Sequence, residues 1–164
     1  MEIRNLDGFL DIMAKETGVL ENLLQIGKDK QEVLLKGDLE KLAEIVRQEE
    51  QLIIAAGQLE HLRYESFASL AGQFNLPETA TLKELAEVCP AEVKRSINEA
   101  GTGLSGLIRN LQELNTQNIS LIDQSLGLIQ YTVESLAGNR ELPLYNKQEK
   151  EQRPAVSLLV DQRV

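Results

Sequence analysis

One long stretch decides the fold of this chain, and it runs from Ala91 to Leu136: AEVKRSINEAGTGLSGLIRNLQELNTQNISLIDQSLGLIQYTVESL. No proline interrupts it, and three rows of aliphatic residues repeat along it at helical spacing. The rows are Ile97, Leu104 and Leu111; Leu107, Leu114, Leu121 and Leu128; and Ile108, Ile122 and Ile129. Rows of this kind form the a/d seam of a coiled-coil-like helix, and a stripe this wide needs more than one partner helix. The pattern predicts a helix over residues 91–137, about 70 Å long at 1.5 Å per residue, that is the spine of an elongated bundle.

Two earlier segments carry the same three-and-four spacing of apolar residues and predict helices over residues 2–36 and 38–75. Between them, Gly37 tolerates the left-handed conformation that ends a helix, and Asp38 can accept hydrogen bonds from the first N–H groups of the next one. A joint this short forces the two helices into an antiparallel hairpin.

Small and polar residues interrupt these seams. In the first helix they are Thr17, Gly27 and Gln31, and we expect thinner packing there. In the long helix they are Gly101, Gly103 and Gly106, each of which costs about 1 kcal/mol relative to Ala in a helix interior. The three glycines indicate either a close approach of another helix or a hinge, and a full break in the helix is the competing interpretation.

Thr81 and Glu84 have the spacing of a capping box, which predicts a short helix over residues 81–89. Beyond Gly138 the apolar residues no longer follow helical spacing. Residues 139–164 are therefore expected to form a flexible tail with an apolar patch from Val156 to Val160. The predicted fold is all-α. It is an elongated, coiled-coil-like antiparallel three-helix bundle over residues 1–138, with one short extra helix and a mobile C-terminal tail.

The composition excludes some classes of binding partner. A net charge of -9 repels the phosphates of nucleic acids and anionic lipid heads, so neither is an expected partner. The start of the chain does not read as a signal peptide, and no segment has the roughly 18 apolar residues that span a bilayer. The single cysteine, Cys89, fits a reducing compartment, and we expect a cytoplasmic protein without membrane insertion.

The residue inventory does not favour an enzyme. His61 is the single histidine and Cys89 the single cysteine, which rules out a two-histidine metal site and every multi-thiolate zinc site. The run from Gly101 to Gly106 resembles a phosphate-binding loop only superficially, because no Lys-Ser/Thr pair follows and no strand precedes it. We therefore expect no catalytic residue, no cofactor and no metal.

The second half of the long helix carries more apolar surface than two neighbouring helices can cover, and such a surplus is typical of a partner site for an amphipathic helix. The candidate partner-binding residues are Asn118, Leu121, Ile122, Ser125, Leu128, Ile129, Val133 and Leu136. Asn118 and Asn115 have a competing interpretation as a buried polar layer that fixes the helix register, which we favour over direct binding. The tail is either a displaceable lid on this surface or a part of the site.

The chain resembles the FlgN family of flagellar type III export chaperones. The likeness lies in the hairpin with its Gly37-Asp38 joint, the Leu59-Glu60 and Arg63 spacing, the run from Leu114 to Leu126, and the Tyr145-Asn146 pair. The resemblance implies a cytoplasmic chaperone that binds the C-terminal helix of the hook-filament junction proteins FlgK and FlgL. It also implies that such a chaperone prevents premature assembly of its client and hands it to the export gate protein FlhA, with Tyr145 in gate docking. A structural coiled-coil protein that acts through homo-oligomerisation is the alternative.

Overall fold

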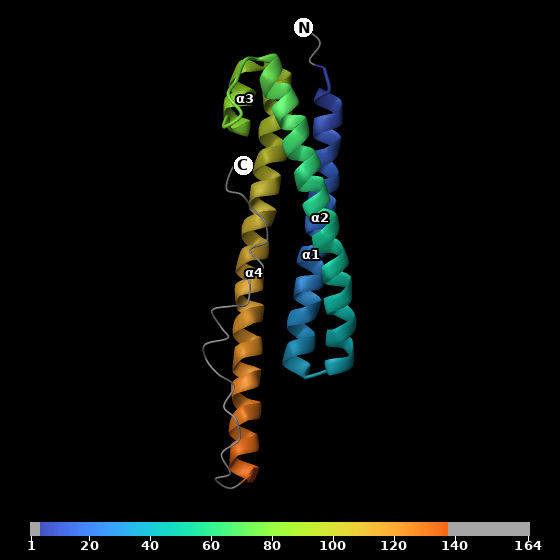
Figure 1. Ribbon diagram of the computed structural model, residues 1–164, viewed down its shortest axis with the longest axis vertical. Helices are drawn as coiled ribbons and strands as arrows, with labels where there is room; N and C mark the ends of the chain where they lie inside the picture. The colour runs from blue at the N-terminus through green and yellow to red at the C-terminus, as the bar shows by residue number, and fades with distance from the viewer. Residues whose placement is uncertain (1–3, 138–164) are drawn as a thin grey trace.

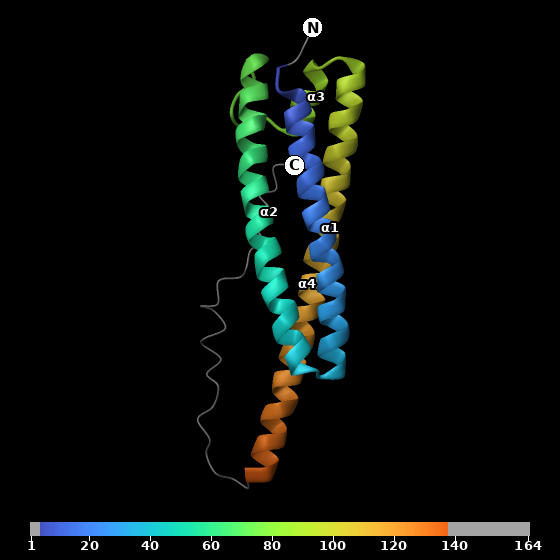
Figure 2. The same ribbon diagram turned by 90° about the vertical axis from the view of Figure 1, so that its right-hand side faces the viewer.

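A computed structural model describes residues 4–137 of the chain, and this part is all-helical. Its helices are α1 (Leu6–Lys36), α2 (Leu39–Gln73), α3 (Leu82–Val88) and α4 (Ala91–Ala137). α1 runs down the long axis of the molecule, α2 returns beside it, and α4 starts at the end where α3 lies and runs down again past the α1–α2 turn (Figures 1 and 2). The all-α prediction is confirmed. Tyr145, the apolar patch from Val156 to Val160 and the rest of the predicted tail lie outside the described residues.

Local signals in the sequence set the helix ends. Gly37 has a φ of 68° and caps α1, and the Asp38 side chain accepts a hydrogen bond from the Lys41 N–H at 3.1 Å. The predicted capping box is also present, because the Thr81 N–H donates to Glu84 at 2.7 Å and the Glu84 N–H donates to the Thr81 hydroxyl at 3.2 Å. The first helix begins at Leu6 rather than at residue 2, since Asn5 adopts a left-handed conformation with a φ of 66°.

The packing order differs from the predicted one. α2 and α4 each pack along α1, whereas no Cα atom of α2 comes within 8 Å of one in α4. The central helix is therefore α1, and the expectation that residues 91–137 form the spine is wrong in this respect. Because α3 carries the chain across the end of the hairpin, α4 runs parallel to α1 and antiparallel to α2 (Figure 2).

The core lies at the end of the rod where α3 joins the long helices. Its buried members come from all four helices: Phe9, Met13, Leu20, Leu23, Leu70, Leu82, Leu85, Ala86, Ile97, Leu104, Ile108 and Leu111. The rings of Phe9 and Phe67 are tilted against each other with centroids 6.3 Å apart, which joins α1 to α2. This core holds the first half of α4 in place.

The glycines of α4 leave the helix unbroken from Ala91 to Ala137. Gly101 is buried, and a Cβ atom at this position would lie only 2.7 Å from Leu82 Cδ2. Gly101 therefore marks a close approach, here of α3, as one of the sequence interpretations proposed, and neither a break nor a second helix segment is present.

Candidate partner-binding surface on helix α4

The register of α4 against α1 is fixed by direct contacts. The Gln31 side chain donates a hydrogen bond to the Gln117 side chain at 3.1 Å. Lys36, the last residue of α1, lies five residues after Gln31, so in parallel helices of equal rise α1 ends level with Ile122. The remaining 15 or so residues of α4, about 22 Å at 1.5 Å per residue, extend beyond the hairpin (Figure 1).

This free end carries the apolar surface expected from the sequence. Leu128 is 67% exposed, Ile129 59% and Leu136 82%. Leu126, Tyr131 and Val133 are exposed as well, and Leu121 and Ile122 are half-buried at the point where the hairpin ends. We define the tip face as the set of Leu121, Ile122, Ser125, Leu128, Ile129, Val133 and Leu136. Within the described residues no other helix covers this face beyond the hairpin turn.

The tip face continues the row by which α4 contacts α1. The buried positions Leu104, Leu111 and Asn118 lie seven residues apart, and the next positions of that repeat are Ser125 and its neighbours on the same side. The Ser125 hydroxyl donates to the Leu121 carbonyl at 2.9 Å, a bond within the helix that leaves the surrounding face apolar. The tip face is therefore the same stripe as the packed one, without its covering helix.

Asn118 does not lie on this exposed surface. It is 1% exposed, and its side-chain amide donates to the Gly27 carbonyl at 2.8 Å. Its Oδ1 atom is buried and makes no hydrogen bond within the described residues. The structure thus places Asn118 in the α1–α4 contact, where the polar-layer interpretation puts it, and we leave it out of the tip face.

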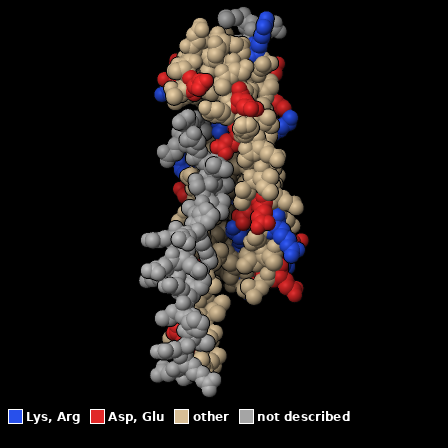
Figure 3. All heavy atoms as spheres, in the orientation of Figure 1, with Lys and Arg blue, Asp and Glu red and all other residues tan. Residues whose placement is uncertain are grey.

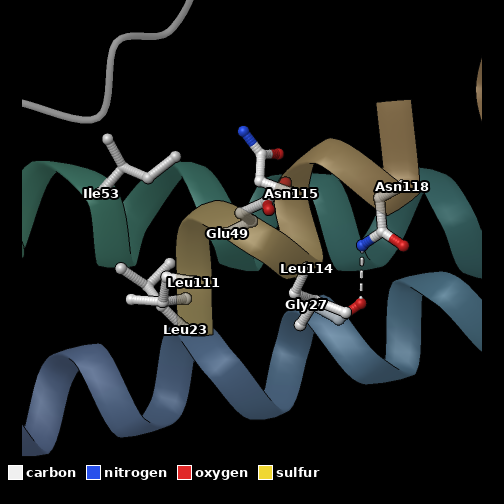
Figure 4. A pocket seen from close by; sticks show the side chains of 8 residues that line it. All are labelled: Leu23, Gly27, Glu49, Ile53, Leu111, Leu114, Asn115 and Asn118. Carbon is white, nitrogen blue, oxygen red and sulfur yellow. Dashed lines mark hydrogen bonds between the residues drawn. The ribbon is translucent and has the colours of Figure 1, made fainter. Parts of the chain in front are cut away.

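A small pocket surrounds this contact (Figure 4). Its lining comes from α1, α2 and α4: Leu23, Gly27, Glu49, Ile53, Leu111, Leu114, Asn115 and Asn118. A Cβ atom at position 27 would lie 2.7 Å from Leu114 Cδ2, so Gly27 lets α4 approach α1 closely. Gly27 is buried in this contact, and Leu114 of α4 takes the place of its missing side chain. The thinner packing expected at Gly27 is limited to this small pocket.

Two ion pairs across the hairpin were missed by the sequence reasoning. Arg63 Nε lies 2.8 Å from Glu16 Oε2, and Lys30 Nζ lies 2.6 Å from Glu49 Oε1. Glu16 and Lys30 are both buried on α1, at positions of the helical repeat where an apolar residue is expected. A charge at such a position was the signal that could have found them, because it needs an opposite charge from the facing helix.

Burial raises the pKa of Glu16 above its ordinary value of 4.5, while the charge and hydrogen bond of Arg63 oppose the rise. The direction indicates that removing this carboxylate from water outweighs its attraction to the guanidinium. The Arg63–Glu16 pair is therefore weak evidence for a large stabilising contribution to the fold.

The other candidate groups are on the surface. His61 lies 3.3 Å from Glu65 one turn further along α2, and both side chains are exposed. In the described part of the chain, no three His, Cys, Asp or Glu side chains gather in a group that could hold a metal ion. None of the helices in this described part has the length and hydropathy to cross a membrane.

The comparison with protein families gives one result. The family profile described as FlgN protein matches residues 1–153. This chain belongs to the FlgN family. The comparisons with curated proteins and with solved structures returned no match.

Membership in the FlgN family confirms the resemblance seen in the sequence and implies a role as a flagellar export chaperone. FlgN proteins bind flagellar proteins and are not known as enzymes. A long helical hairpin with an exposed apolar helix end is a shape that suits such binding, because an amphipathic helix of a partner can lie along it.

Proposed function

We propose that this chain is a cytoplasmic chaperone of flagellar export that binds the C-terminal amphipathic helix of hook-associated proteins of the FlgK and FlgL type. The bound helix is kept from premature assembly, and the complex is delivered to the export gate protein FlhA, with Tyr145 as the docking residue. Family membership supports the class of function, and the tip face supports the place where the client binds.

The observation that carries the proposal is the change in exposure along α4. Ile108 is 9% exposed and Ile129 is 59% exposed, although both belong to the same row of the repeat. Burying one leucine side chain removes enough apolar area to contribute about 1.5–3 kcal/mol, so a partner helix that covers several tip-face residues can bind at micromolar concentrations or below.

The test is a titration of the purified chain with synthetic peptides of the C-terminal 30 or so residues of FlgK and FlgL from the same cell, a length that exceeds the free end of α4. The double variant Leu121→Asp and Leu128→Asp should abolish binding, because a bound helix would have to bury two carboxylates. Ile54→Asp is the matched control, since Ile54 is a 62% exposed aliphatic residue of α2 away from the tip. Unchanged binding by the double variant would remove the tip face as the client site.

Homo-oligomerisation is the alternative outcome of the same experiment. Sedimentation of the chain alone at micromolar concentration should show a monomer if the tip face serves a client. A fixed oligomer that Leu128→Asp dissociates would instead assign the tip face to a second copy of the chain.

A further inference from the structure

The two buried ion pairs of the hairpin obey one alignment of α1 and α2. Glu16 is 4% exposed, and its carboxylate accepts a hydrogen bond from Arg63 Nε at 2.8 Å. Lys30 is 8% exposed, and its ammonium group donates to both carboxylate oxygens of Glu49, at 2.6 and 2.7 Å. From 16 to 30 and from 49 to 63 the separation is 14 residues, so the pairs lie two heptads apart on both helices.

The two pairs belong to one row of residues on each helix. The α1 row is Phe9, Glu16, Leu23 and Lys30, and the α2 row, in the order that faces it, is Leu70, Arg63, Ala56 and Glu49. Phe9, Leu23 and Leu70 are buried in the core, and Ala56 packs against it. The α1 row therefore reads apolar, acidic, apolar, basic, and the α2 row opposite it reads apolar, basic, apolar, acidic.

An alignment shifted by one heptad would break this match. Glu16 would face Leu70 in one direction and Ala56 in the other. Lys30 would face Ala56 and Leu42 in the same two cases. Each shift would leave both charges of α1 buried without a partner, which is strongly destabilising.

An alignment shifted by two heptads would bring like charges together. In one direction Glu16 would face Glu49. In the other direction Lys30 would face Arg63. Like charges at these buried positions would repel each other, so the order of the charges disfavours this shift as well.

The Gly37-Asp38 turn alone does not exclude the shifted hairpins. A shift of one heptad moves the turn by roughly three to four residues, which is about one helical turn. Opening the last turn of a helix has a low free-energy cost. A second signal is therefore needed to fix the alignment.

We propose that the two buried ion pairs select the register of the α1–α2 hairpin against its heptad-shifted alternatives. A buried ion pair gains little over well-packed apolar side chains, whereas separating its members is costly, so its main effect is on the wrong registers. The pairs Lys15–Asp11 and Arg95–Glu99 cannot act in this way, because each lies within one helix and its side chains are at least 60% exposed. Figure 3 shows acidic and basic side chains on the outer surface of the rod.

The register determines how much of α4 is left uncovered. α1 ends at Lys36, level with Ile122 of α4, because the turn follows it. A hairpin shifted by one heptad would turn about 5 Å earlier or later along the rod and would change the free end of α4 by roughly one helical turn. This inference does not depend on the proposed function, since it holds whatever the tip face binds.

Exchanging charges within one helix tests the pairing without a change in net charge. Arg63→Glu with Glu49→Arg should lower the melting temperature by roughly 10 °C or more, because the observed register then buries two pairs of like charge. Glu16→Lys with Lys30→Glu should have the same effect. All four substitutions together restore opposite charges and should recover most of the loss.

An exposed pair provides the matched control. Asp11→Lys with Lys15→Asp should change the melting temperature by no more than about 2 °C, because both side chains are in water. The inference is wrong if the fourfold variant melts no higher than the two exchanged variants. It is also wrong if the exchanged variants melt like the wild type.

A distance measurement separates selection of the register from stability. Spin labels attached at Glu21→Cys and Gln58→Cys in a Cys89→Ala chain report the alignment, since Glu21 and Gln58 are exposed and lie at the same level of the hairpin. The wild-type charges should give one distance between the labels.

The decisive variant combines Glu16→Leu, Lys30→Leu, Glu49→Leu and Arg63→Leu. Its melting temperature should not fall, because packed leucines replace ion pairs at little or no cost. It should nevertheless give a second distance, from hairpins shifted by about 10 Å along the helix axis. A single distance equal to that of the wild type would show that the turn and the apolar residues fix the register without the ion pairs, and would overturn the proposal.

Discussion

The two halves of α4 share one sequence pattern and have opposite surroundings. In the first half, Ile97 and Leu104 are 0% exposed against α1 and α3, and in the second half Ile129 and Leu136 are 59% and 82% exposed. The repeat of aliphatic residues continues beyond Ile122, whereas the hairpin that covers it ends at that level. The comparison shows that an apolar stripe predicts the need for a partner, and that the length of the neighbouring helices decides whether the partner is internal.

The largest difference between the halves should appear in stability. Leu104→Ala removes a fully buried side chain and leaves a cavity, so we expect a loss of about 2–5 kcal/mol in the free energy of unfolding. Leu128→Ala, at a position with 67% exposure, should cost less than about 1 kcal/mol. Urea denaturation followed by circular dichroism measures both, and equal losses would mean that the free half of α4 is packed in solution.

A second contrast concerns glycines. At Gly27 a Cβ atom meets Leu114 at 2.7 Å, whereas at Gly127, in the free half of α4, nothing lies within 4 Å. Gly27→Ala should therefore lose about 1–3 kcal/mol through overpacking, offset in part by helix propensity. Gly127→Ala should be neutral or stabilising by at most about 1 kcal/mol. A Gly27→Ala chain as stable as the wild type would contradict the expected overpacking and would mean that the Leu114 side chain moves aside.

Asn118 and Ser125 occupy equivalent positions one heptad apart, one buried and one exposed. Asn118→Ala removes the hydrogen bond to the Gly27 carbonyl and should cost about 0.5–1.5 kcal/mol. Ser125→Ala should leave the denaturation midpoint unchanged. Client affinity provides the control. If Asn118→Ala folds normally but binds the client much more weakly than the wild type does, Asn118 contributes to client binding.

The smallest effect is that of pH on the packed half. Because the pKa of Glu16 is raised in the folded state, the folded chain keeps this proton to a higher pH than the unfolded chain. Its contribution to stability is fully present below the ordinary value of 4.5 and is lost as the pH rises through the folded-state pKa. Glu16→Gln removes this dependence, so the variant should gain stability relative to the wild type between acidic and neutral pH, as followed by thermal melts. If the Glu16→Gln variant instead lost stability relative to the wild type over this pH range, the pKa of Glu16 would be lowered in the folded state and not raised.

Much of the local structure could be predicted. The Gly37-Asp38 joint, the Thr81 and Glu84 capping box and the long helix from Ala91 all follow from signals within a few residues of one another. The surplus of apolar positions also predicted an uncovered surface on the second part of α4, where the candidate residues from Ser125 to Leu136 are exposed. The hydrogen bond from Asn118 to the Gly27 carbonyl could not be predicted, because it joins residues that are 91 positions apart in the chain.

The sequence by itself determined most of the helix ends, although not the start of α1, and which faces are apolar, because capping and amphipathic spacing are local properties of the chain. Only the tertiary structure decided that α1 is the central helix, that Glu16 and Lys30 find partners in α2, and that α4 extends past the hairpin. The reason is that register and neighbour choice come from contacts between distant segments, and a repeat of leucines is compatible with many of them. The free end of α4 is such a case, since its exposure is set by where a different helix stops.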